Sequence, residues 1–208
     1  MGGRAREKSV KHYSSKHKIL LVGEGDFSFS KCLATAFGTA ANMTATSLDN
    51  KEWLQRKHRQ AMANVEELKN MGCTIIHGVS AHRMKDHPQL QSKYFDRVVF
   101  NFPHSGFSHR AEDSYHMIKR HRKLVWAFLI NASEMLTKKG QIHVTHKTTY
   151  PYSEWDIEGL AEEAGLRLLK ISPFDIDEYD GYVNKKGDGS KCDKSFPAGN
   201  SCTYKFAI

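Results

Sequence analysis

The feature that most constrains the fold is a buried strand that runs directly into a glycine loop. Residues 18–23 read Lys-Ile-Leu-Leu-Val-Gly, a continuous apolar run that ends in glycine. A run of this kind is typical of a strand buried on both faces of a parallel sheet. Residues 23–28 then read Gly-Glu-Gly-Asp-Phe-Ser, and the glycines permit a tight turn from the strand into a helix. The sequence therefore predicts the start of an α/β domain.

The rest of the chain alternates between strand and helix patterns. Such alternation favours right-handed crossovers and a parallel sheet with helices on both faces. No helix separates the last two strands, so we expect them to pair as a hairpin, which puts one antiparallel strand at the end of the strand order. The expected strands are 43–48, 73–77, 95–100, 141–146, 167–171 and 201–207, and the expected helices are 28–37, 51–71, 113–138 and 154–164.

Composition and length indicate one globular domain. The chain has 208 residues, of which 39% are hydrophobic. We interpret residues 1–16 as a basic flexible arm and residues 17–208 as a single domain. Residues 182–200 are rich in glycine and lysine and form either a functional loop or a disordered link. We expect this protein to be a monomer.

Several classes of protein are excluded at this stage. No apolar run approaches ~18 residues and the N-terminus has no apolar segment, so we expect neither a transmembrane helix nor a signal peptide. The four cysteines are isolated, a pattern typical of reduced thiols, and we expect an intracellular protein of the nucleus, nucleolus or cytoplasm. There is no P-loop lysine and no nucleophile elbow, which removes NTPase and hydrolase functions.

The charge is unevenly distributed. The net charge is +8, yet residues 150–183 contain nine acidic and only two basic side chains. Basic clusters lie at 4–18, 119–123 and 185–194 and alternate with aromatic and histidine residues. This pattern favours a polyanion such as RNA as a partner, with an ordinary solvated surface as the alternative. We expect Lys185 and Lys186 to contact RNA.

The glycine loop is the first candidate for a cofactor site, because doubly wound sheets bind ligands at the carboxyl ends of their strands. The loop lacks the third glycine of a dinucleotide fingerprint, and its two acidic residues would repel a pyrophosphate. A cofactor with a cationic centre and a ribose fits better, and S-adenosylmethionine is such a molecule. The residues expected to bind it here are Gly23, Glu24, Gly25, Asp26, Phe27 and Ser28.

Asp49 follows the second predicted strand and is the candidate for ribose binding. A carboxylate at this position can accept hydrogen bonds from both ribose hydroxyls. The alternative is that Asp49 caps the helix that begins near residue 51, because aspartate is a favoured N-cap residue.

The fourth predicted strand runs into Asn101-Phe-Pro-His104. This rigid turn resembles the Asn/Asp-Pro-Pro-Tyr turn of methyltransferases that act on planar nitrogens. We expect Asn101 to contact the cofactor and to orient a base by hydrogen bonds, and we expect His104 to act as general base. The alternative is that His104 only hydrogen-bonds a neighbouring loop. We expect the substrate base to be held by Phe102, Pro103 and Phe107.

A metal site is not expected from the histidine spacing. His104, His109, His116 and His121 follow no zinc pattern, and no His-Glu-x-x-His motif is present.

Four strings together resemble the eukaryotic large-subunit rRNA (uridine-N3)-methyltransferase-like family, and most of all its short, single-domain plant members. They lie at residues 18–30, 45–49, 95–104 and 142–147, and the resemblance extends from about residue 12 to the C-terminus. It implies a Rossmann-like S-adenosylmethionine-dependent methyltransferase fold and a uridine of rRNA as substrate.

One departure from the family pattern affects the adenine site. Residues 78–80 read Gly-Val-Ser, where the family has Gly-Val-Asp. An acid near that point accepts a hydrogen bond from the adenine amino group in related folds, so we expect Val79 and Ser80 to bind adenine differently. Two alternative functions stay open: a non-catalytic RNA-binding protein on the same fold, and an NAD-dependent oxidoreductase.

Overall fold

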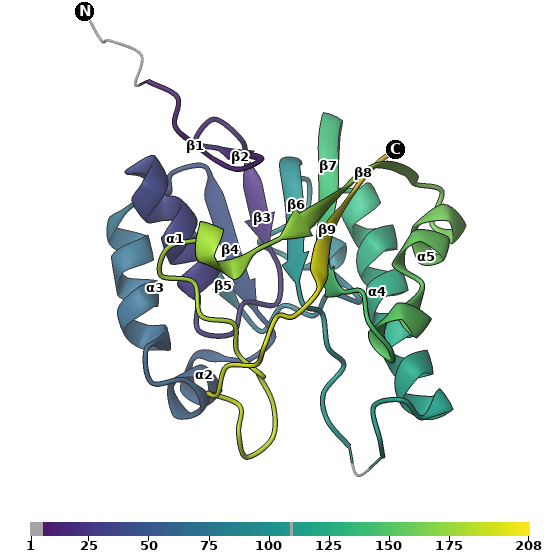
Figure 1. Ribbon diagram of the computed structural model, residues 1–208. Helices are drawn as coiled ribbons and strands as arrows, with labels where there is room; N and C mark the ends of the chain where they lie inside the picture. The colour runs from purple at the N-terminus through teal and green to yellow at the C-terminus, as the bar shows by residue number, and fades with distance from the viewer. Residues whose placement is uncertain (1–5, 109) are drawn as a thin grey trace, which may run out of the picture.

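The computed structural model describes residues 6–108 and 110–208 and contains a seven-stranded sheet between two layers of helices (Figure 1). Every strand of this sheet is parallel to its neighbours except β9, which is antiparallel to both of its own. The predicted α/β class with a mostly parallel sheet and a C-terminal hairpin is therefore confirmed. In order across the sheet, the strands are β5 (Thr74–His77), β4 (Met43–Ser47), β3 (Ile19–Leu21), β6 (Phe95–Asn101), β7 (Leu136–Lys147), β9 (Ser201–Ala207) and β8 (Arg167–Phe174).

The position of β9 differs from the expectation. We expected the antiparallel strand at the end of the strand order, but β9 lies between β7 and β8, and β8 is the edge strand. The crossover from β7 to β8 leaves a gap one strand wide, and β9 fills it by pairing with both neighbours. Most side chains of β9 are buried, whereas most of those of β8 are exposed, which agrees with an interior and an edge position.

The helices form two layers that explain the continuous apolar run of β3. Ile19 and Leu21 pack on one face of the sheet and Leu20 packs on the other, so both faces of the strand are buried. The first layer contains α1 (Ser28–Phe37) and α3 (Ala61–Asn70), with α2 (Lys51–Lys57) preceding α3, and the second contains α4 (Tyr115–Ser133) and α5 (Ile157–Glu163).

Three of the predicted helices differ from their expected bounds. The helix expected at 113–138 is α4, which ends at Ser133, and β7 begins at Leu136, earlier than the strand expected at 141–146. The helix expected at 51–71 is interrupted at His58, whose backbone is extended and whose imidazole is buried with Nδ1 3.3 Å from the Asp193 carboxylate. The interruption allows His58 to turn inward toward a segment more than 130 residues away. The helix expected at 154–164 begins instead as the 3-10 turn η2 (Tyr152–Trp155). Two further 3-10 turns are η1 (Met84–Asp86) and η3 (Ile176–Glu178).

The N-terminal segment is more ordered than expected. Within the predicted flexible arm, β1 (Ser9–Val10) and β2 (Tyr13–Ser14) form a hairpin. Tyr13 is only 1% exposed, because its ring packs in the core and its hydroxyl lies 3.2 Å from Nδ1 of His143. Residues 1–5 of the predicted arm lie outside the described residues. None of the helices within 6–108 and 110–208 combines the length and the apolar character that crossing a membrane requires.

Candidate functional site

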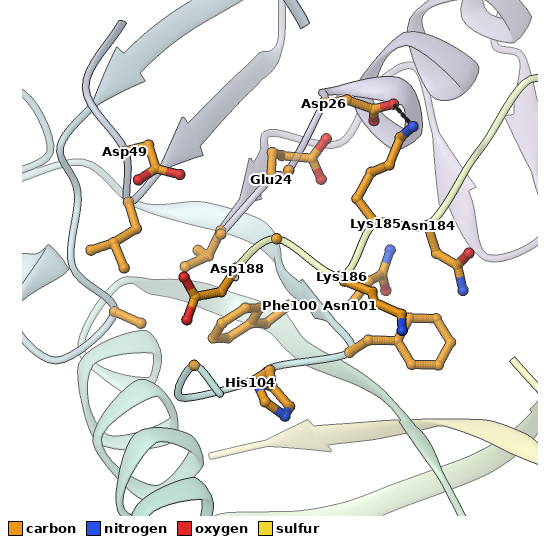
Figure 2. Close-up of a pocket in the computed structure, with 18 of the residues that line it drawn as sticks. Glu24, Asp26, Asp49, Phe100, Asn101, His104, Asn184, Lys185, Lys186 and Asp188 are labelled. Carbon is orange, nitrogen blue, oxygen red and sulfur yellow. Dashed lines mark ion pairs between the residues drawn. The ribbon is translucent and has the colours of Figure 1, made fainter. Parts of the chain in front are cut away.

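A cavity of about 640 Å³ opens at the carboxyl ends of the central strands β3, β4 and β6. Its place agrees with the rule for doubly wound sheets, and its size lies within the range of roughly 300–1,000 Å³ that is common for small-molecule sites. Figure 2 shows side chains from distant parts of the chain converging on it. The predicted site residues that line it are Gly23, Glu24, Gly25, Asp26, Phe27, Ser28, Asp49, Val79, Ser80, Asn101, Phe102, His104, Lys185 and Lys186.

The glycine loop approaches its neighbours closely, so that Gly23 excludes a side chain and Gly25 leaves room for one only if its neighbour shifts. Gly23 has a φ of +68°, and a Cβ there would lie 2.5 Å from a ring carbon of Phe100. A Cβ on Gly25 would lie 3.3 Å from Cβ of Lys185. The backbone of the loop is therefore exposed to the cavity without intervening side chains, as close approach of a ligand requires.

Glu24 is turned toward the beginning of α1. Its carboxylate accepts hydrogen bonds from the Ser30 amide at 3.2 Å and from the Ser30 hydroxyl at 2.8 Å. The residue before α1 is Phe27, which has a φ of +63° and offers no capping side chain, so Glu24 supplies a capping oxygen from three residues upstream. Burial raises the pKa of Glu24 to about 7, although the Ser30 hydrogen bonds oppose this shift.

Asp49 is not the N-cap of α2. That role belongs to Asn50, whose side chain accepts a hydrogen bond from the Trp53 amide at 2.8 Å. The Asp49 carboxylate instead accepts hydrogen bonds from the Lys57 ammonium at 2.9 and 3.0 Å. Leu48 also lines the cavity, and its side chain is 67% exposed. Sequence reasoning missed this residue. A leucine at the end of a strand could have indicated an apolar surface for a ligand.

Residues 183–194, which we call the roof segment, fold over the glycine loop. The Ser28 hydroxyl is hydrogen-bonded to the amide and the carbonyl of Val183 at 3.0 and 3.1 Å. The Lys185 ammonium lies 3.7 Å from the Asp26 carboxylate and 3.0 Å from the Asp193 carboxylate, and the Lys185 side chain is only 13% exposed. The charge of Lys185 is therefore paired within the protein, and its contact with RNA stays a prediction.

The roof segment also reaches the turn that follows β6. A carboxylate oxygen of Asp188 accepts a hydrogen bond from the Phe107 amide at 3.2 Å. Figure 2 shows Lys186 on the same side of the cavity as Asn101. Asp188 and Asp193 were missed by sequence reasoning, because nothing local indicates which loops a long glycine-rich link will contact.

Asn101 carries the clearest sign of a ligand. Within the described residues, neither the amide nitrogen nor the amide oxygen of its side chain has a hydrogen-bond partner, and both atoms are buried. Figure 2 shows this amide projecting into the cavity. Buried polar groups in native proteins are almost always satisfied, so an unsatisfied amide at a cavity wall indicates a missing donor and acceptor from a ligand.

His104 belongs to a cluster on the other side of the turn. Nε2 of His104 and Nε2 of His121 each lie 3.2 Å from one Glu112 carboxylate oxygen. Nδ1 of His104 is buried and has no hydrogen-bond partner among residues 6–108 and 110–208. Burial lowers the pKa of His104, and it lowers the pKa of His121 to about 4. Figure 2 shows the His104 ring pointing away from Asn101. The assignment of His104 as general base stays a prediction.

The same cluster brings together three possible metal ligands that show no zinc spacing in the sequence. Ligand atoms of His104, Glu112 and His121 all lie within 4.8 Å of one another. The Ser105 amide donates a hydrogen bond to Nδ1 of His121 at 3.1 Å, which places the proton of the neutral ring on Nε2. A metal would need Nε2 without its proton, so the geometry favours a carboxylate that accepts from two imidazoles. The absence of a metal stays a prediction, and His109 lies outside the described residues.

The aromatic residues predicted to hold a base differ in their accessibility. The Phe102 ring packs against Phe174 and Phe196, with ring centroids 5.5 and 5.2 Å away. Pro103 is buried and does not line the cavity. Phe107 is 44% exposed beside the cavity, so it is the ring that a base could reach.

The fold and the site together define a Rossmann-like methyltransferase class. A methyltransferase from Pyrococcus furiosus superposes with a TM-score of 0.56 at 14% identity, covering 92% of this chain and 76% of that one. A TehB-like SAM-dependent methyltransferase from Corynebacterium glutamicum gives a TM-score of 0.50 at 17% identity, covering 92% and 79%. At these identities the likeness establishes the fold.

The chain belongs to the family described as rRNA (uridine-N3-)-methyltransferase BTM5-like, whose model matches residues 20–186. It is 50% identical to an Arabidopsis thaliana protein described as uncharacterized, covering 96% of this chain and 97% of that protein. It is 49% identical to heavy metal-associated isoprenylated plant protein 41 of the same species, but spans only 38% of that protein's length. The 25S rRNA (uridine(2634)-N(3))-methyltransferase of Saccharomyces cerevisiae is 24% identical, covering 91% of this chain and 71% of that protein. The predicted family is confirmed.

S-adenosylmethionine is the cofactor of this fold and family, and the residues present fit it. Gly23 and Gly25 line the cavity without side chains, and the carboxylate of Asp49, the predicted ribose ligand, lines the same cavity. The cofactor supplies a methyl group on a sulfonium. At the adenine position the Ser80 hydroxyl accepts a hydrogen bond from the His82 amide at 3.3 Å, so its use by adenine stays a prediction.

Proposed function

We propose that this chain transfers the methyl group of S-adenosylmethionine to N3 of a uridine in rRNA. The observation that carries the proposal is the buried amide of Asn101, which has no partner within the described residues and borders the cofactor cavity. The Watson–Crick edge of uracil alternates acceptor, donor and acceptor, and the amide nitrogen of Asn101 can donate to one of the two carbonyl oxygens that flank N3, which leaves N3 itself open to the methyl group. The name of the yeast relative supports the same atom.

Access to N3 requires an unpaired or flipped base, because N3 lies on the pairing edge. A flipped base needs a flat surface to stack on, and Phe107 offers an exposed ring at the edge of the site. N3 also carries a proton that has to leave. The Glu112 carboxylate accepts the Nε2 proton of His104, which leaves Nδ1 as the basic nitrogen. The proposal requires the ring to turn toward Asn101, so that Nδ1 meets the N3 proton.

RNA as the substrate class is supported by the exposed side of α4. His116, Lys119 and Lys123 lie on this side together with Tyr115, which is 73% exposed. Lys123 and Arg120 also line the cavity, so the basic surface continues into the site. Basic side chains that track the nucleic-acid backbone, together with an exposed aromatic ring on which a base can stack, are typical of proteins that bind single-stranded RNA.

The test uses the purified chain, labelled S-adenosylmethionine and three RNA oligonucleotides that differ at one position. They carry uridine, cytidine or 3-deazauridine, and the last of these keeps the shape of uridine but has carbon in place of N3. We expect label to enter only the uridine oligonucleotide, and digestion with mass spectrometry to identify 3-methyluridine. Equal labelling of the 3-deazauridine oligonucleotide would contradict transfer to N3.

A binding protein without turnover is the second candidate, favoured by the hydroxyl at position 80 where the family has an acid. Calorimetric titration with S-adenosylmethionine separates the two functions. Binding followed by label transfer supports the enzyme, whereas retained RNA binding with no cofactor binding supports the non-catalytic protein.

A further inference from the structure

A row of cationic side chains crosses one face of the sheet, away from the cofactor cavity. Arg97 of β6 lies opposite Gln141 of β7, and His143 of β7 lies opposite Lys205 of β9. Lys205 in turn lies opposite Lys170 of the edge strand β8. Because alternate residues of a strand share a face, these side chains all project from the same side of the sheet. We call this row the cationic sheet face.

Within the part of the chain that the structure describes, no α-helix covers this face at the β6–β8 side. Helices α1 and α3 pack over the β3–β5 half of the same face, while α4 and α5 pack on the opposite side (Figure 1). The N-terminal hairpin instead packs on the middle of the row, where the Tyr13 hydroxyl lies 3.2 Å from Nδ1 of the fully buried His143 and the His12 ring lies 4.9 Å from the His143 ring. The hairpin is at the end of the sheet opposite to the roof segment (Figure 1). The row is therefore a second surface, separate from the cavity.

Several polar groups on the cationic sheet face lack partners within residues 6–108 and 110–208. Nε of Arg97 and Nε2 of His12 are buried without a hydrogen bond. Lys205 is only 9% exposed, and its pKa is lowered by burial and by the charges of Lys170 and Arg97, with no acid opposing them. An uncompensated charge of this kind is costly to bury unless a counter-charge binds.

The nearest acids are occupied elsewhere. The Asp96 carboxylate accepts hydrogen bonds from the Lys18 amide at 2.9 Å and from the Thr137 hydroxyl at 2.7 Å. Glu178 forms an ion pair with Lys11 of the hairpin. The charge of Asp96 still partly compensates Arg97, because it opposes the lowering of the Arg97 pKa by burial, whereas no acid opposes the lowering of the Lys205 pKa.

A buried hydrogen-bond network orients the side-chain amide of Gln141, which is one further donor. The Tyr13 hydroxyl lies 3.2 Å from Nδ1 of His143, and Nε2 of His143 lies 3.0 Å from the amide oxygen of Gln141. With the tyrosine donating to Nδ1, the imidazole donates from Nε2, and the Gln141 oxygen is its acceptor. This fixes the orientation of the amide and leaves the Gln141 nitrogen for an acceptor outside the protein.

We infer that the cationic sheet face binds phosphate groups of the RNA backbone. The row runs across three gaps between neighbouring strands of ~4.8 Å each, about 14 Å in total, which exceeds one phosphate ion. Because the hairpin packs on His143, successive phosphates of a chain would meet the row at its two ends, Arg97 with Gln141 and Lys205 with Lys170. The donors are an arginine, two lysines and an oriented amide, the groups that phosphate oxygens accept from. The identity of the polyanion rests on the proposed function, whereas the anion site itself does not.

The test compares the double variant Lys170→Gln/Lys205→Gln with the double variant Lys69→Gln/Lys93→Gln. The control removes the same charge from two exposed lysines, one on α3 and one before β6, that lie outside the row. Binding of a single-stranded RNA oligonucleotide is followed by fluorescence anisotropy at several salt concentrations. Two lost phosphate contacts reduce the slope of log K against log salt by roughly 1.4, and we expect about tenfold weaker binding at low salt. The control is expected to change the slope by less than half as much.

Equal affinity and slope in the two double variants would overturn the inference. Because Lys205 is buried, folding of each variant is checked by thermal melting, and Lys170→Gln alone on the exposed edge strand keeps the test valid with about half of the effect. A parallel titration with inorganic phosphate follows the Gln141 side-chain amide by NMR. A response to phosphate without any change in the RNA slope would mean a small-anion site and would also overturn the inference. A loss of methyl transfer with intact salt-dependent RNA binding would count against the proposed function only.

Discussion

The Lys57 ammonium lies 2.9 and 3.0 Å from the two carboxylate oxygens of Asp49. The same ammonium lies 3.3 Å from the Gly187 carbonyl, so one lysine joins the ribose-binding candidate to the roof segment. A ribose bound at Asp49 has to share or replace these hydrogen bonds. The cofactor site and the roof are thus coupled through Lys57.

Asp49→Ala is expected to weaken S-adenosylmethionine binding by roughly 30- to 150-fold, because two hydrogen bonds to a charged acceptor contribute on the order of 2–3 kcal/mol. Calorimetric titration measures the affinity. Asn50→Ala is the matched control: loss of the α2 N-cap is expected to reduce stability by about 1 kcal/mol with little effect on affinity. A change below about threefold in Asp49→Ala would contradict the ribose assignment.

Gly25→Val is expected to abolish cofactor binding while circular dichroism shows the fold retained. A side chain at this position meets Lys185 of the roof at 3.3 Å, and this neighbour can move aside. Gly23→Val is the contrasting variant, since its φ is positive and a Cβ would lie 2.5 Å from the Phe100 ring. We expect that variant to melt at a clearly lower temperature. Unchanged cofactor affinity in Gly25→Val would show that the loop is not the binding site.

Asn101→Ala is expected to separate stability from function. Its amide has no partner among the described residues, so its removal is expected to leave the melting temperature unchanged or higher. Single-turnover methyl transfer to a uridine oligonucleotide is expected to fall by ~10²-fold or more, with cofactor affinity nearly unchanged. A clear loss of stability together with normal transfer would assign Asn101 a structural role.

His104→Ala is expected to reduce the single-turnover rate by ~10²-fold or more at neutral pH, and the defect is expected to shrink as pH rises and the imide ionises by itself. Glu112→Gln is the companion variant, because it keeps the shape but weakens the acceptor that orients His104. Its defect is expected to be smaller and in the same direction. A wild-type rate in His104→Ala would remove this residue from the reaction.

His146 makes stability depend on pH. Burial lowers the pKa of His146 to about 4, below the unfolded value of about 6.5, so the unfolded chain binds the proton more strongly. The contribution of the neutral His146 to the free energy of unfolding is complete above pH 6.5. It is lost as the pH falls toward 4, and the loss reaches roughly 3 kcal/mol. His146→Gln keeps a donor for the Tyr152 carbonyl without titrating. Urea unfolding from pH 7 to 4 is expected to show a shallower decline in this variant, and an equal decline would contradict the assignment.

The local part of the site could be predicted from the sequence. The apolar run before Gly23 can only be a strand buried on both faces, and the parallel sheet then places its carboxyl end beside those of β4 and β6. The glycine loop, Asp49 and Asn101 therefore meet at one cavity, as expected. The helix at 28–37 was predicted with its observed bounds, because Gly38 ends it in a left-handed conformation.

Only the tertiary structure decided what the long links contact. Lys185 pairs with Asp26, although the local pattern predicts a contact with RNA. His58 turns toward Asp193, although the pattern places it within a continuous helix, and Lys57 pairs with Asp49, although the pattern leaves it in solvent. These pairings join segments up to about 160 residues apart, and no local periodicity encodes them. Burial and charge in three dimensions select the partners. The sequence by itself therefore determined the sheet and the cofactor edge, whereas the roof and the cationic sheet face exist only because distant strands and loops pack together.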